Sequence, residues 1–208
     1  MGDVTFSGLQ LVAAPGRVMT PRATSEQLVA AARAHIADGG SRVVDVGTGT
    51  GAVAIAIAIA CPHAEVWATD TRADAVLLAR ANVRRYQLGD RVSIRQGDLL
   101  VPVDGRLDVI AANLPYMPAS AAADYPELQA EPFDAVFAAG DGLEPYRRLV
   151  EAAITRLSDS GVLLLQLDRR LVAARRSELP ALHTAFAASR SADLPAAAVV
   201  QAIAGKAA

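Results

Sequence analysis

The sequence predicts an α/β protein in which a mostly parallel sheet is covered by helices on both faces. Apolar strand-like segments alternate with helix-like segments along the chain, as is typical of parallel sheets. A glycine-rich turn separates the first such strand from the next helix, as in nucleotide-binding α/β folds. The chain has 208 residues, 52% hydrophobic and 20% charged, which suffices for a substantial core. We expect one domain over 1–208, with a hairpin-like extension over 1–24 and a core over 25–208.

Turn and capping residues define the predicted elements at the start of the chain. The first twenty residues read as a short two-stranded element that turns at Pro15-Gly16. A helix over 25–37 is expected next, with Thr24 as its N-cap and Gly39-Gly40 as its end. The first strand of the main sheet is then Arg42–Val46.

The segment after the glycine-rich turn has an ambiguous period. Isoleucine alternates with alanine in "AVAIAIAIA", as in a strand, but every residue there is apolar, so periodicity cannot decide. The short turn before it and Cys61-Pro62 after it favour a helix buried against the sheet. The elements expected next are a strand over 65–69, a helix over 74–86 with Val76, Ala79 and Val83 on one face, and strands over 92–96 and 107–112.

A long segment over 117–140, for which no regular structure is predicted, precedes an amphipathic helix that Asp159-Ser160-Gly161 is expected to close. The strand over 162–167 is apolar except for Gln166. The apolar residues at helical spacing in the helix are Leu143, Tyr146, Leu149, Val150, Ile154 and Leu157. The last predicted elements are a helix broken at Pro180 and two small strands, over 183–189 and 197–203, that would form an antiparallel edge pair.

Composition and charge exclude several classes of protein. A single cysteine, Cys61, and three scattered histidines provide no metal-ligand cluster, so we expect no metal site and no disulfide. The longest uncharged apolar run, Ala52–Cys61, is too short to span a bilayer, and no secretion signal is visible, which indicates a cytoplasmic protein. A net charge of -2 argues against sequence-independent binding to nucleic acid.

The first candidate site is the glycine-rich turn "DVGTGTGA". Glycines allow the backbone to approach a ligand closely, and the N-terminus of the following helix offers unpaired N–H groups. The same letters satisfy a dinucleotide fingerprint, so the turn alone does not separate a nicotinamide cofactor from S-adenosylmethionine. The candidate cofactor-binding residues here are Asp45, Gly47, Thr48, Gly49, Thr50 and Gly51.

Two further carboxylates follow neighbouring strands. Asp70, followed by Thr71, ends the second strand, where its carboxylate is placed to bind the two hydroxyls of a ribose. Asp98 follows the third strand, where its carboxylate and the N–H of Leu99 are placed to recognise the edge of an adenine ring. Capping or solvation of Asp70 and turn chemistry at Asp98 are the alternatives. The ends of these parallel strands meet at one edge of the sheet, which predicts a single ligand crevice.

The fourth strand ends in "NLPY", Asn113, Leu114, Pro115 and Tyr116, which we predict to be the catalytic element. The amide oxygen of Asn113 and a backbone carbonyl in the next turn can accept two hydrogen bonds from an NH2 group and orient its nitrogen toward an electrophile. Proline fixes the turn, and the tyrosine offers a flat face to a planar substrate. The alternative is a structural Asn-Pro turn with a core tyrosine.

Several stretches of the sequence together resemble the release-factor glutamine N5-methyltransferases, the HemK/PrmC type. They are "FSGLQLVAAPGRVMTPRATSEQLV", "VVDVGTGTGAVAIAIA", "WATDTRADAVLLARANVRR", "NLPYMP" and "EPFDAVFAAGDGLEPYRRLV". In the first of them Pro21, Arg22 and Glu26 match the family's Pro-Arg-x-x-Thr-Glu signature, with Ser25 in place of the threonine. The similarity covers about residues 5 to 167.

This resemblance implies a Rossmann-like class I methyltransferase fold, with a seven-stranded sheet whose last strand is antiparallel. It also implies that S-adenosylmethionine is held at Gly47–Gly51, Asp70, Asp98 and Leu99, and that Asn113–Tyr116 hold the side-chain amide of a glutamine. The sequence departs from the family where Leu114 replaces the first proline of the usual Asn-Pro-Pro-Tyr, and where Asp168–Leu171 stand in place of a Gly-x-x-Gln element.

The resemblance also bears on substrate recognition. The N-terminal helical domain of bacterial members is expected to be absent, which leaves room for a different partner or for a recognition subunit in trans. The segment from Pro118 to Pro132, with Tyr125, Glu127 and Glu131, is the expected substrate-facing loop. A disordered insert is the alternative for this segment.

The leading hypothesis is S-adenosylmethionine-dependent methylation of a planar NH2 nitrogen, with a glutamine of a release factor or a similar protein as the first candidate acceptor. A nucleobase amino group in RNA or DNA is the runner-up acceptor, and a small organic acceptor is a third. A nicotinamide-dependent oxidoreductase would lack a tyrosine-lysine proton relay, since Lys206 is the only lysine. A catalytically silent cofactor-binding module is supported only by Leu114.

Overall fold

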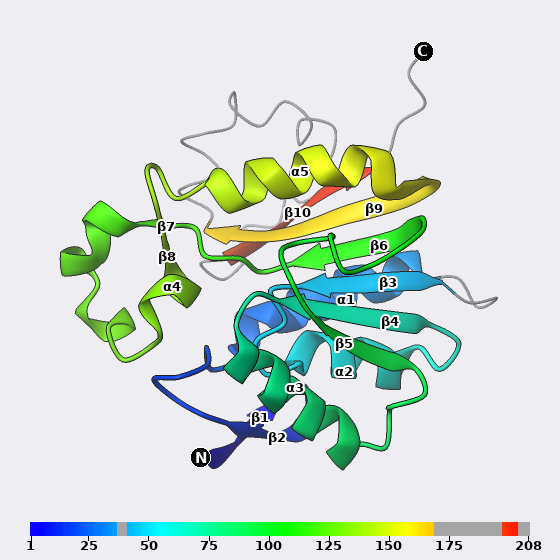
Figure 1. Ribbon diagram of the computed structural model, residues 1–208, viewed down its shortest axis with the longest axis horizontal. Helices are drawn as coiled ribbons and strands as arrows, with labels where there is room; N and C mark the ends of the chain where they lie inside the picture. The colour runs from blue at the N-terminus through cyan, green and yellow to red at the C-terminus, as the bar shows by residue number, and fades with distance from the viewer. Residues whose placement is uncertain (37–40, 169–196, 204–208) are drawn as a thin grey trace.

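The structure is a computed structural model that describes residues 1–36, 41–168 and 197–203 (Figure 1). In this part of the chain six strands form the central sheet, in the order β10-β9-β6-β3-β4-β5. Neighbouring strands are parallel except β9 and β10, which are antiparallel. The strands are β3 Arg42–Val46, β4 Glu65–Asp70, β5 Val92–Gln96, β6 Leu107–Ala112, β9 Leu157–Asp168 and β10 Ala197–Ile203. The predicted fold class is confirmed, although six strands rather than seven are described.

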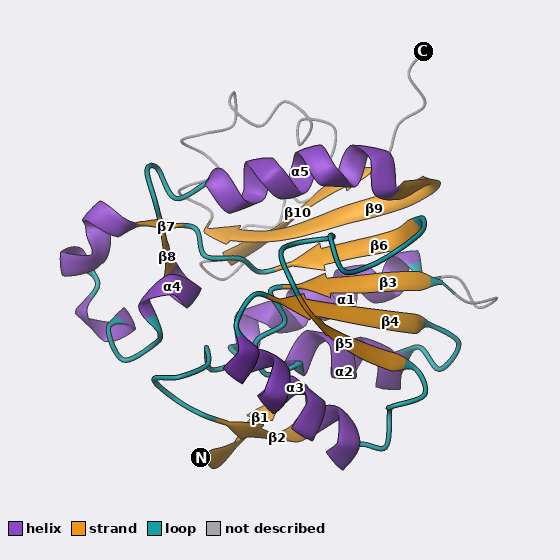
Figure 2. Ribbon diagram, in the orientation of Figure 1, coloured by secondary structure: helices purple, strands orange, loops and turns teal. Residues whose placement is uncertain are grey.

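Helices cover both faces of this sheet (Figure 2). They are α1 Glu26–His35, α2 Ala52–Ala60 and α3 Ala73–Arg85 on one face, and α5 Glu144–Arg156 on the other. Successive residues of a strand point to opposite faces, so each strand contributes to two cores. Val43 of β3, for example, packs in the core with α1, α2 and α3, whereas Val44 packs in the core with α5.

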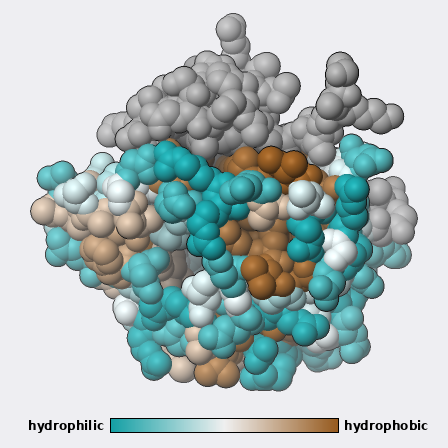
Figure 3. Space-filling model, turned by 45° about the horizontal axis from the view of Figure 1, so that its top comes forward, coloured by the Kyte–Doolittle hydropathy of each residue, from teal (hydrophilic) through white to brown (hydrophobic). Residues whose placement is uncertain are grey.

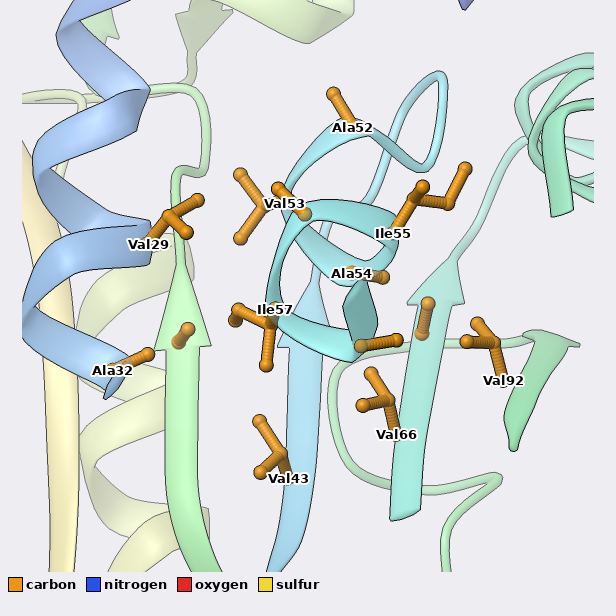
Figure 4. Close-up of a cluster of buried hydrophobic side chains, with 14 of the residues drawn as sticks. Val29, Ala32, Val43, Ala52, Val53, Ala54, Ile55, Ile57, Val66 and Val92 are labelled. Atoms are coloured by element: carbon orange, nitrogen blue, oxygen red, sulfur yellow. The ribbon is translucent and has the colours of Figure 1, made fainter. Parts of the chain in front are cut away.

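Helix α2 lies beside α1 on one face of the sheet (Figure 4). Its residues from Ala52 to Ala58 are all buried. Val29 and Ala32 of α1 face it from the side, and Val43 and Val66 lie on the strands that it covers. A helix that is surrounded by protein is apolar on every side, so the alternating isoleucines do not indicate a strand. The predicted helix is confirmed.

The N-terminal residues form an antiparallel hairpin, as predicted, but the predicted turn was wrong. Strands β1 Gly2–Phe6 and β2 Leu9–Ala13 are joined by Ser7 and Gly8. Both of these residues have positive φ, +48° and +76°, as a two-residue type I′ turn requires. Pro15-Gly16 lies beyond the second strand and belongs to the connection to α1.

The start of α1 also differs from the prediction. A short 3-10 helix, η1 Ala23–Ser25, leads directly into it, so Ser25 rather than Thr24 occupies the N-cap position, and no side-chain capping bond forms there. The hydroxyl of Thr24 instead accepts a hydrogen bond from Gln166 Nε2, at 3.2 Å. The predicted stop at Gly39-Gly40 lies outside the described residues.

Helix α5 passes into β9 without the predicted turn. Asp159-Ser160-Gly161 lies within β9, because Leu157 already pairs with Leu107 and a register shift follows between Leu107 and Val109. Ile154, counted among the apolar residues at helical spacing in this helix, is 70% exposed. Residues 197–203 form a strand as predicted but pair with β9. The predicted helix around Pro180 and the strand over 183–189 lie outside the described residues.

The segment over 117–140 contains regular structure, contrary to the prediction. Its two ends pair as short parallel strands, and the rings of Phe133 and Phe137 lie 4.9 Å apart. The elements are β7 Met117–Pro118, η2 Ala119–Asp124, η3 Pro126–Leu128, α4 Phe133–Val136 and β8 Phe137–Ala138. Residues 117–138, the 117–138 segment, form a lobe beside the carboxyl ends of the central strands (Figure 1).

The surface of the molecule is mixed in character. In the space-filling view of Figure 3, apolar residues gather in a patch at the middle of the face shown, with polar surface around it. No helix within the described residues combines the length and the apolar character that crossing a membrane requires.

Asn82 connects the N-terminal hairpin to the rest of the fold through hydrogen bonds. This fully buried residue of α3 accepts a hydrogen bond from Val12 N–H at 2.8 Å and donates to Val12 O at 3.0 Å. Its amide also donates to Thr50 O in the glycine-rich turn, at 2.9 Å. One side chain therefore pairs with three backbone groups from two separate segments, one group buried and two partly buried.

We expect Asn82→Ala to lower the free energy of unfolding by about 2 to 3 kcal/mol, because it leaves one buried and two partly buried backbone groups without their partner. Urea denaturation measures the change. Leu77→Ala is the control, since Leu77 lies on the same helix but is 65% exposed, and its truncation is expected to cost less than about 0.5 kcal/mol. Equal effects of the two substitutions would contradict this role for Asn82.

Candidate active site

A cavity of about 890 Å³ opens at the carboxyl ends of the central strands. The chain leaves β3 toward β4 and β5 on one side, whereas β6 and β9 lie on the other side. Ligands of open α/β sheets bind where the strand order reverses in this way. The cavity is lined by the loops after β3, β4, β5 and β6, by the segment before α1, and by the 117–138 segment.

Hydrogen bonds hold the glycine-rich turn after β3 to the end of β4. Thr69 O accepts from Gly47 N–H at 2.8 Å and from Thr48 N–H at 2.9 Å. Asp70 Oδ2 accepts from Gly49 N–H, also at 2.9 Å. The turn is therefore fixed by the neighbouring strand before any ligand binds.

The three glycines of this turn have different environments. A Cβ at Gly49 would meet no atom nearer than 3.9 Å, so this is the place where backbone is open to the cavity. A Cβ at Gly47 would lie 2.7 Å from Leu114 Cδ2. Gly51 does not line the cavity, and a Cβ there would lie 3.2 Å from Ala79 Cβ. Gly51 therefore allows α2 and α3 to pack closely, and its predicted role in cofactor binding stays a prediction.

Asp45 supports the turn from below. Its Oδ2 accepts hydrogen bonds from Thr48 Oγ1 at 2.6 Å and from Ala54 N–H at 3.2 Å. Burial raises the pKa of the Asp45 carboxyl to about 6, although these two hydrogen bonds oppose the shift. The floor of the cavity is formed by three buried residues, Asp45, Thr48 and Thr50.

The two other carboxylates predicted to bind a cofactor also line the cavity. Asp70 accepts backbone N–H bonds from Gly49 and from Arg72, and burial raises its pKa. Asp98 forms an ion pair with Arg148 of α5. Thr71 and Leu99 are part of the same wall, and Leu99 O accepts a hydrogen bond from Thr69 Oγ1 at 2.8 Å. Four strand tips therefore meet around one space, as predicted.

Asn113 is held in one orientation by the start of α1. Its Nδ2 donates a hydrogen bond to Ser25 Oγ at 3.2 Å. With the nitrogen of the amide used in this way, Oδ1 remains as the hydrogen-bond acceptor of the side chain. Asn113 and Ser25 both line the cavity.

The Leu114 main chain is held by Tyr146 of α5. The Tyr146 hydroxyl accepts a hydrogen bond from Leu114 N–H at 2.9 Å and lies 3.0 Å from Leu114 O. It also lies 2.6 Å from Gln166 O of β9. Pro115 and Tyr116 line the cavity, and the ring of Tyr116 meets that of Tyr146 edge to face, with centroids 6.5 Å apart. The Leu114 carbonyl, a candidate for the second acceptor, is thus held in place beside this hydroxyl and keeps a lone pair for a further hydrogen bond.

The 117–138 segment is tied to the walls of the cavity. Tyr125, in the loop expected to face the substrate, lines the cavity. Glu131, in the same loop, accepts a hydrogen bond from Thr20 N–H at 3.1 Å and pairs with Arg22 at 3.7 Å. Arg72 pairs with Asp134 at 2.7 Å. Glu127 lies in η3, outside the residues whose side chains are described.

Three residues of the cavity region were not predicted to belong to a site. Gln166 was visible in the sequence as the one polar residue of an apolar strand. Tyr146 was assigned to the apolar face of a helix. The one signal that sets it apart from the other residues of that face is its hydroxyl, which needs hydrogen-bond partners when it is buried. Thr24 was assigned as a helix cap. Among the described residues there is no cluster of three or more residues that could hold a metal ion.

Comparisons with known proteins agree with this geometry. Residues 24–126 match the family model of the methyltransferase small domain. The chain is 39% identical over 170 residues to the release factor glutamine methyltransferase of Gloeobacter violaceus, which covers 80% of this chain and 59% of that protein. It is 39% identical over 181 residues to the enzyme of the same name from Deinococcus radiodurans, covering 86% of this chain and 64% of that one. The chain thus spans about 60% of the length of these relatives.

A relative with a different named substrate also matches. The ribosomal protein uL3 glutamine methyltransferase of Burkholderia pseudomallei is 37% identical over 117 residues, covering 52% of this chain and 38% of that one. Among solved structures, the ribosomal protein L11 methylase of Lactobacillus delbrueckii superposes with a TM-score of 0.63 at 20% identity. That match covers 91% of this chain and 82% of the other, and it supports the fold.

The raised pKa of Asp45 predicts a pH dependence of stability. The folded chain keeps this proton up to about pH 6, whereas the unfolded chain loses it near the ordinary value of 3.8. Between these values the folded state binds more protons, so the free energy of unfolding falls as the pH rises. The loss from this one group is on the order of 3 kcal/mol by pH 7.

Asp45→Asn removes the titration and keeps a side-chain oxygen for Thr48 and Ala54. We expect the difference in free energy of unfolding between wild type and Asp45→Asn to change by this amount between pH 4 and pH 7, as measured by urea denaturation across that range. If the free energies of unfolding of the two proteins changed with pH in the same way, burial would not raise the pKa of Asp45.

Proposed function

From its methyltransferase small domain and its similarity to release factor glutamine methyltransferases, we propose that this protein is an S-adenosylmethionine-dependent N-methyltransferase that acts on the side-chain amide of a protein glutamine. One observation carries the proposal most directly. Asn113 lines the same cavity as the glycine-rich turn, with its amide nitrogen bonded to Ser25 and its oxygen left as an acceptor.

The proposed cofactor site is the half of the cavity beside the glycine-rich turn. Gly49 offers open backbone, and Asp70 has acceptor capacity beyond its two backbone bonds, which suits ribose hydroxyls. Asp98 and the Leu99 backbone are proposed to bind the adenine, and this requires Asp98 to share or leave its ion pair with Arg148. The buried carboxylates Asp45 and Asp70 favour a ligand with positive charge.

S-adenosylmethionine, which Gly49, Asp70 and Asp98 would hold, would supply the methyl group to the acceptor nitrogen, with S-adenosylhomocysteine as the leaving group and the proton of the nitrogen passing to water. Asn113 Oδ1 is proposed to accept a hydrogen bond from the NH2 group of the acceptor. This bond turns the nitrogen lone pair out of the amide plane and strengthens as the nitrogen gains positive charge, so it stabilises the transition state more than the ground state.

The relatives indicate which acceptors to test first. The named substrates are a release factor for two of them and ribosomal protein uL3 for another. We propose a protein glutamine because all three names specify glutamine. The 117–138 segment, which closes one side of the cavity, is proposed to contact the acceptor protein. We propose a cytoplasmic location, which would fit acceptors of the translation machinery. We also propose that a separate subunit contributes to the recognition of the acceptor.

Transfer of the methyl group from labelled S-adenosylmethionine tests the proposal. We expect purified release factor, or ribosomal protein uL3, to become labelled, and peptide mass spectrometry to place the methyl group on a glutamine. Label in a cell extract that resists protease and is lost on nuclease treatment would instead identify a nucleic acid acceptor. Label that resists both treatments would identify a small molecule.

We expect Asn113→Ala to lower kcat by at least about a hundredfold while the Kd for S-adenosylhomocysteine stays within about tenfold, because the side chain acts mainly on the nitrogen in the transition state. Steady-state kinetics and calorimetry measure the two quantities. Gln10→Ala is the control, since it truncates an exposed amide of the hairpin. Wild-type turnover by Asn113→Ala would overturn the assigned role.

A further inference from the structure

The side chain of Arg72 joins the loop after β4 to the 117–138 segment. One of its terminal nitrogens, Nη1, lies 2.7 Å from both carboxylate oxygens of Asp134 in α4. The other two nitrogens donate to Asp74 at 2.8 Å and 3.1 Å, and to Arg17 O, in the connection between β2 and α1, at 3.1 Å. Five hydrogen bonds thus use the five N–H groups of the guanidinium, so its position is defined from three sides.

Arg72 also contacts the proposed ribose-binding carboxylate. Its main-chain N–H donates to Asp70 Oδ1 at 3.0 Å. Arg72 and Asp134 both line the cavity, together with Ala135 and Val136 of α4. The Arg72–Asp134 pair therefore joins two walls of one space, the wall at the end of β4 and the wall formed by the 117–138 segment.

Among the described residues, two ion pairs attach the 117–138 segment to other parts of the chain, and they differ in exposure. The side chain of Glu131, which pairs with Arg22, is only 12% exposed. The side chain of Asp134 is 58% exposed and that of Arg72 is 34% exposed. Water and salt weaken an exposed pair, so it opens at a small cost in free energy. The end of the segment that carries Asp134 is therefore the end that can move away from the cavity most easily.

We propose that Arg72 and Asp134 are positioning residues that couple cofactor binding to the placement of the 117–138 segment. Both walls that they join face a cofactor bound beside Asp70, so the closed arrangement binds the cofactor more tightly than an open one. The closed arrangement also fixes the segment that is proposed to contact the acceptor protein. Cofactor and acceptor therefore each strengthen the binding of the other. This inference rests on the proposed function.

Asp134→Ala tests the pair, because it truncates an exposed side chain and leaves Arg72 bonded to Asp74. We expect the Kd for S-adenosylhomocysteine, from calorimetry, to rise roughly three- to fivefold, at the upper end of what an exposed pair contributes. Asp134→Glu keeps a carboxylate and is expected to stay within about twofold of wild type. Asp3→Ala is the matched control, since Asp3 forms a pair of similar exposure with Arg85 and neither residue lines the cavity. An equal rise in Kd in the alanine variants of Asp3 and Asp134 would contradict the inference.

Amide hydrogen exchange, followed by mass spectrometry, reports on the segment directly. In wild type and in Asp3→Ala we expect S-adenosylhomocysteine to slow exchange in peptides from residues 126–138. In Asp134→Ala most of this protection is expected to be lost, whereas the glycine-rich turn is still protected. If the ligand protected the segment equally in wild type and in Asp134→Ala, the pair would not carry the coupling.

Binding of the acceptor tests the other direction of the coupling. We expect purified release factor to bind wild type roughly three- to fivefold more tightly in the presence of S-adenosylhomocysteine, and Asp134→Ala to lose this difference. With both substrates saturating, kcat of Asp134→Ala is expected to stay within about threefold of wild type, because the pair positions the segment and does not touch the reacting atoms. A larger loss of kcat with the coupling intact would place Asp134 in the chemical step and refute its assignment as a positioning residue.

These measurements separate the inference from the function on which it rests. If wild type binds S-adenosylhomocysteine but methylates neither the release factor nor ribosomal protein uL3, the proposed function fails, and hydrogen exchange still decides whether the pair couples the ligand to the segment. If wild type does not bind S-adenosylhomocysteine, both fail. If wild type is active and Asp134→Ala has the same Kd, the same protection and the same coupling, only the inference fails.

Discussion

The two loops that form the centre of the cavity can touch because residue 47 has no side chain. A Cβ at that position would lie 2.7 Å from Leu114 Cδ2, so the leucine side chain would have to shift, and the φ of +73° at residue 47 also favours glycine. The parallel sheet brings the ends of β3 and β6 side by side, and the contact of Leu114 with Gly47 fills the space between their loops. This contact also explains how leucine is accommodated where related sequences usually have proline. Its side chain is buried and fills the space beside the glycine, so packing supplies part of the rigidity that a proline ring would give.

Helix α5 acts on the site through a single hydroxyl. Tyr146 is fully buried, and burial raises its pKa well above the ordinary value, so the phenol keeps its proton. That proton is shared between Gln166 O and Leu114 O, while the oxygen accepts from Leu114 N–H. The end of β6 is therefore held to β9 by this hydroxyl, and Asn113, which directly follows β6, is positioned with it. A helix that reads as an ordinary amphipathic element thus controls the geometry of the proposed acceptor site.

The sequence predicted those features that follow from local pattern. The parallel strands, the buried helix α2 and the convergence of the glycine-rich turn with Asp70, Asp98 and Asn113 are all set by apolar runs and by polar residues at strand ends. The errors fall where tertiary contacts override such patterns. Pro15-Gly16 looked like the hairpin turn, but cross-strand pairing placed the turn at Ser7-Gly8. Asp159-Ser160-Gly161 looked like a helix stop, but pairing with β6 drew it into β9. The partners of Gln166, Glu131 and Tyr146 lie far away in the sequence, and no local pattern identifies them.

The segment between the hairpin and α1 belongs to the site as much as the strand tips do. Thr20 and Arg22 contact Glu131 of the 117–138 segment, and Thr24 and Ser25 orient Gln166 and Asn113. Ser7 N–H also donates to Glu26 Oε1, at 2.8 Å, which links the hairpin turn to the start of α1. Residues 20–26 therefore join three parts of the molecule that the sheet alone does not connect. Each of these two hydroxyls accepts a hydrogen bond from an amide nitrogen, so the segment before α1 sets which way the side chains of Asn113 and Gln166 face. The sheet fixes where these amides begin, and residues 20–26 fix how they are turned.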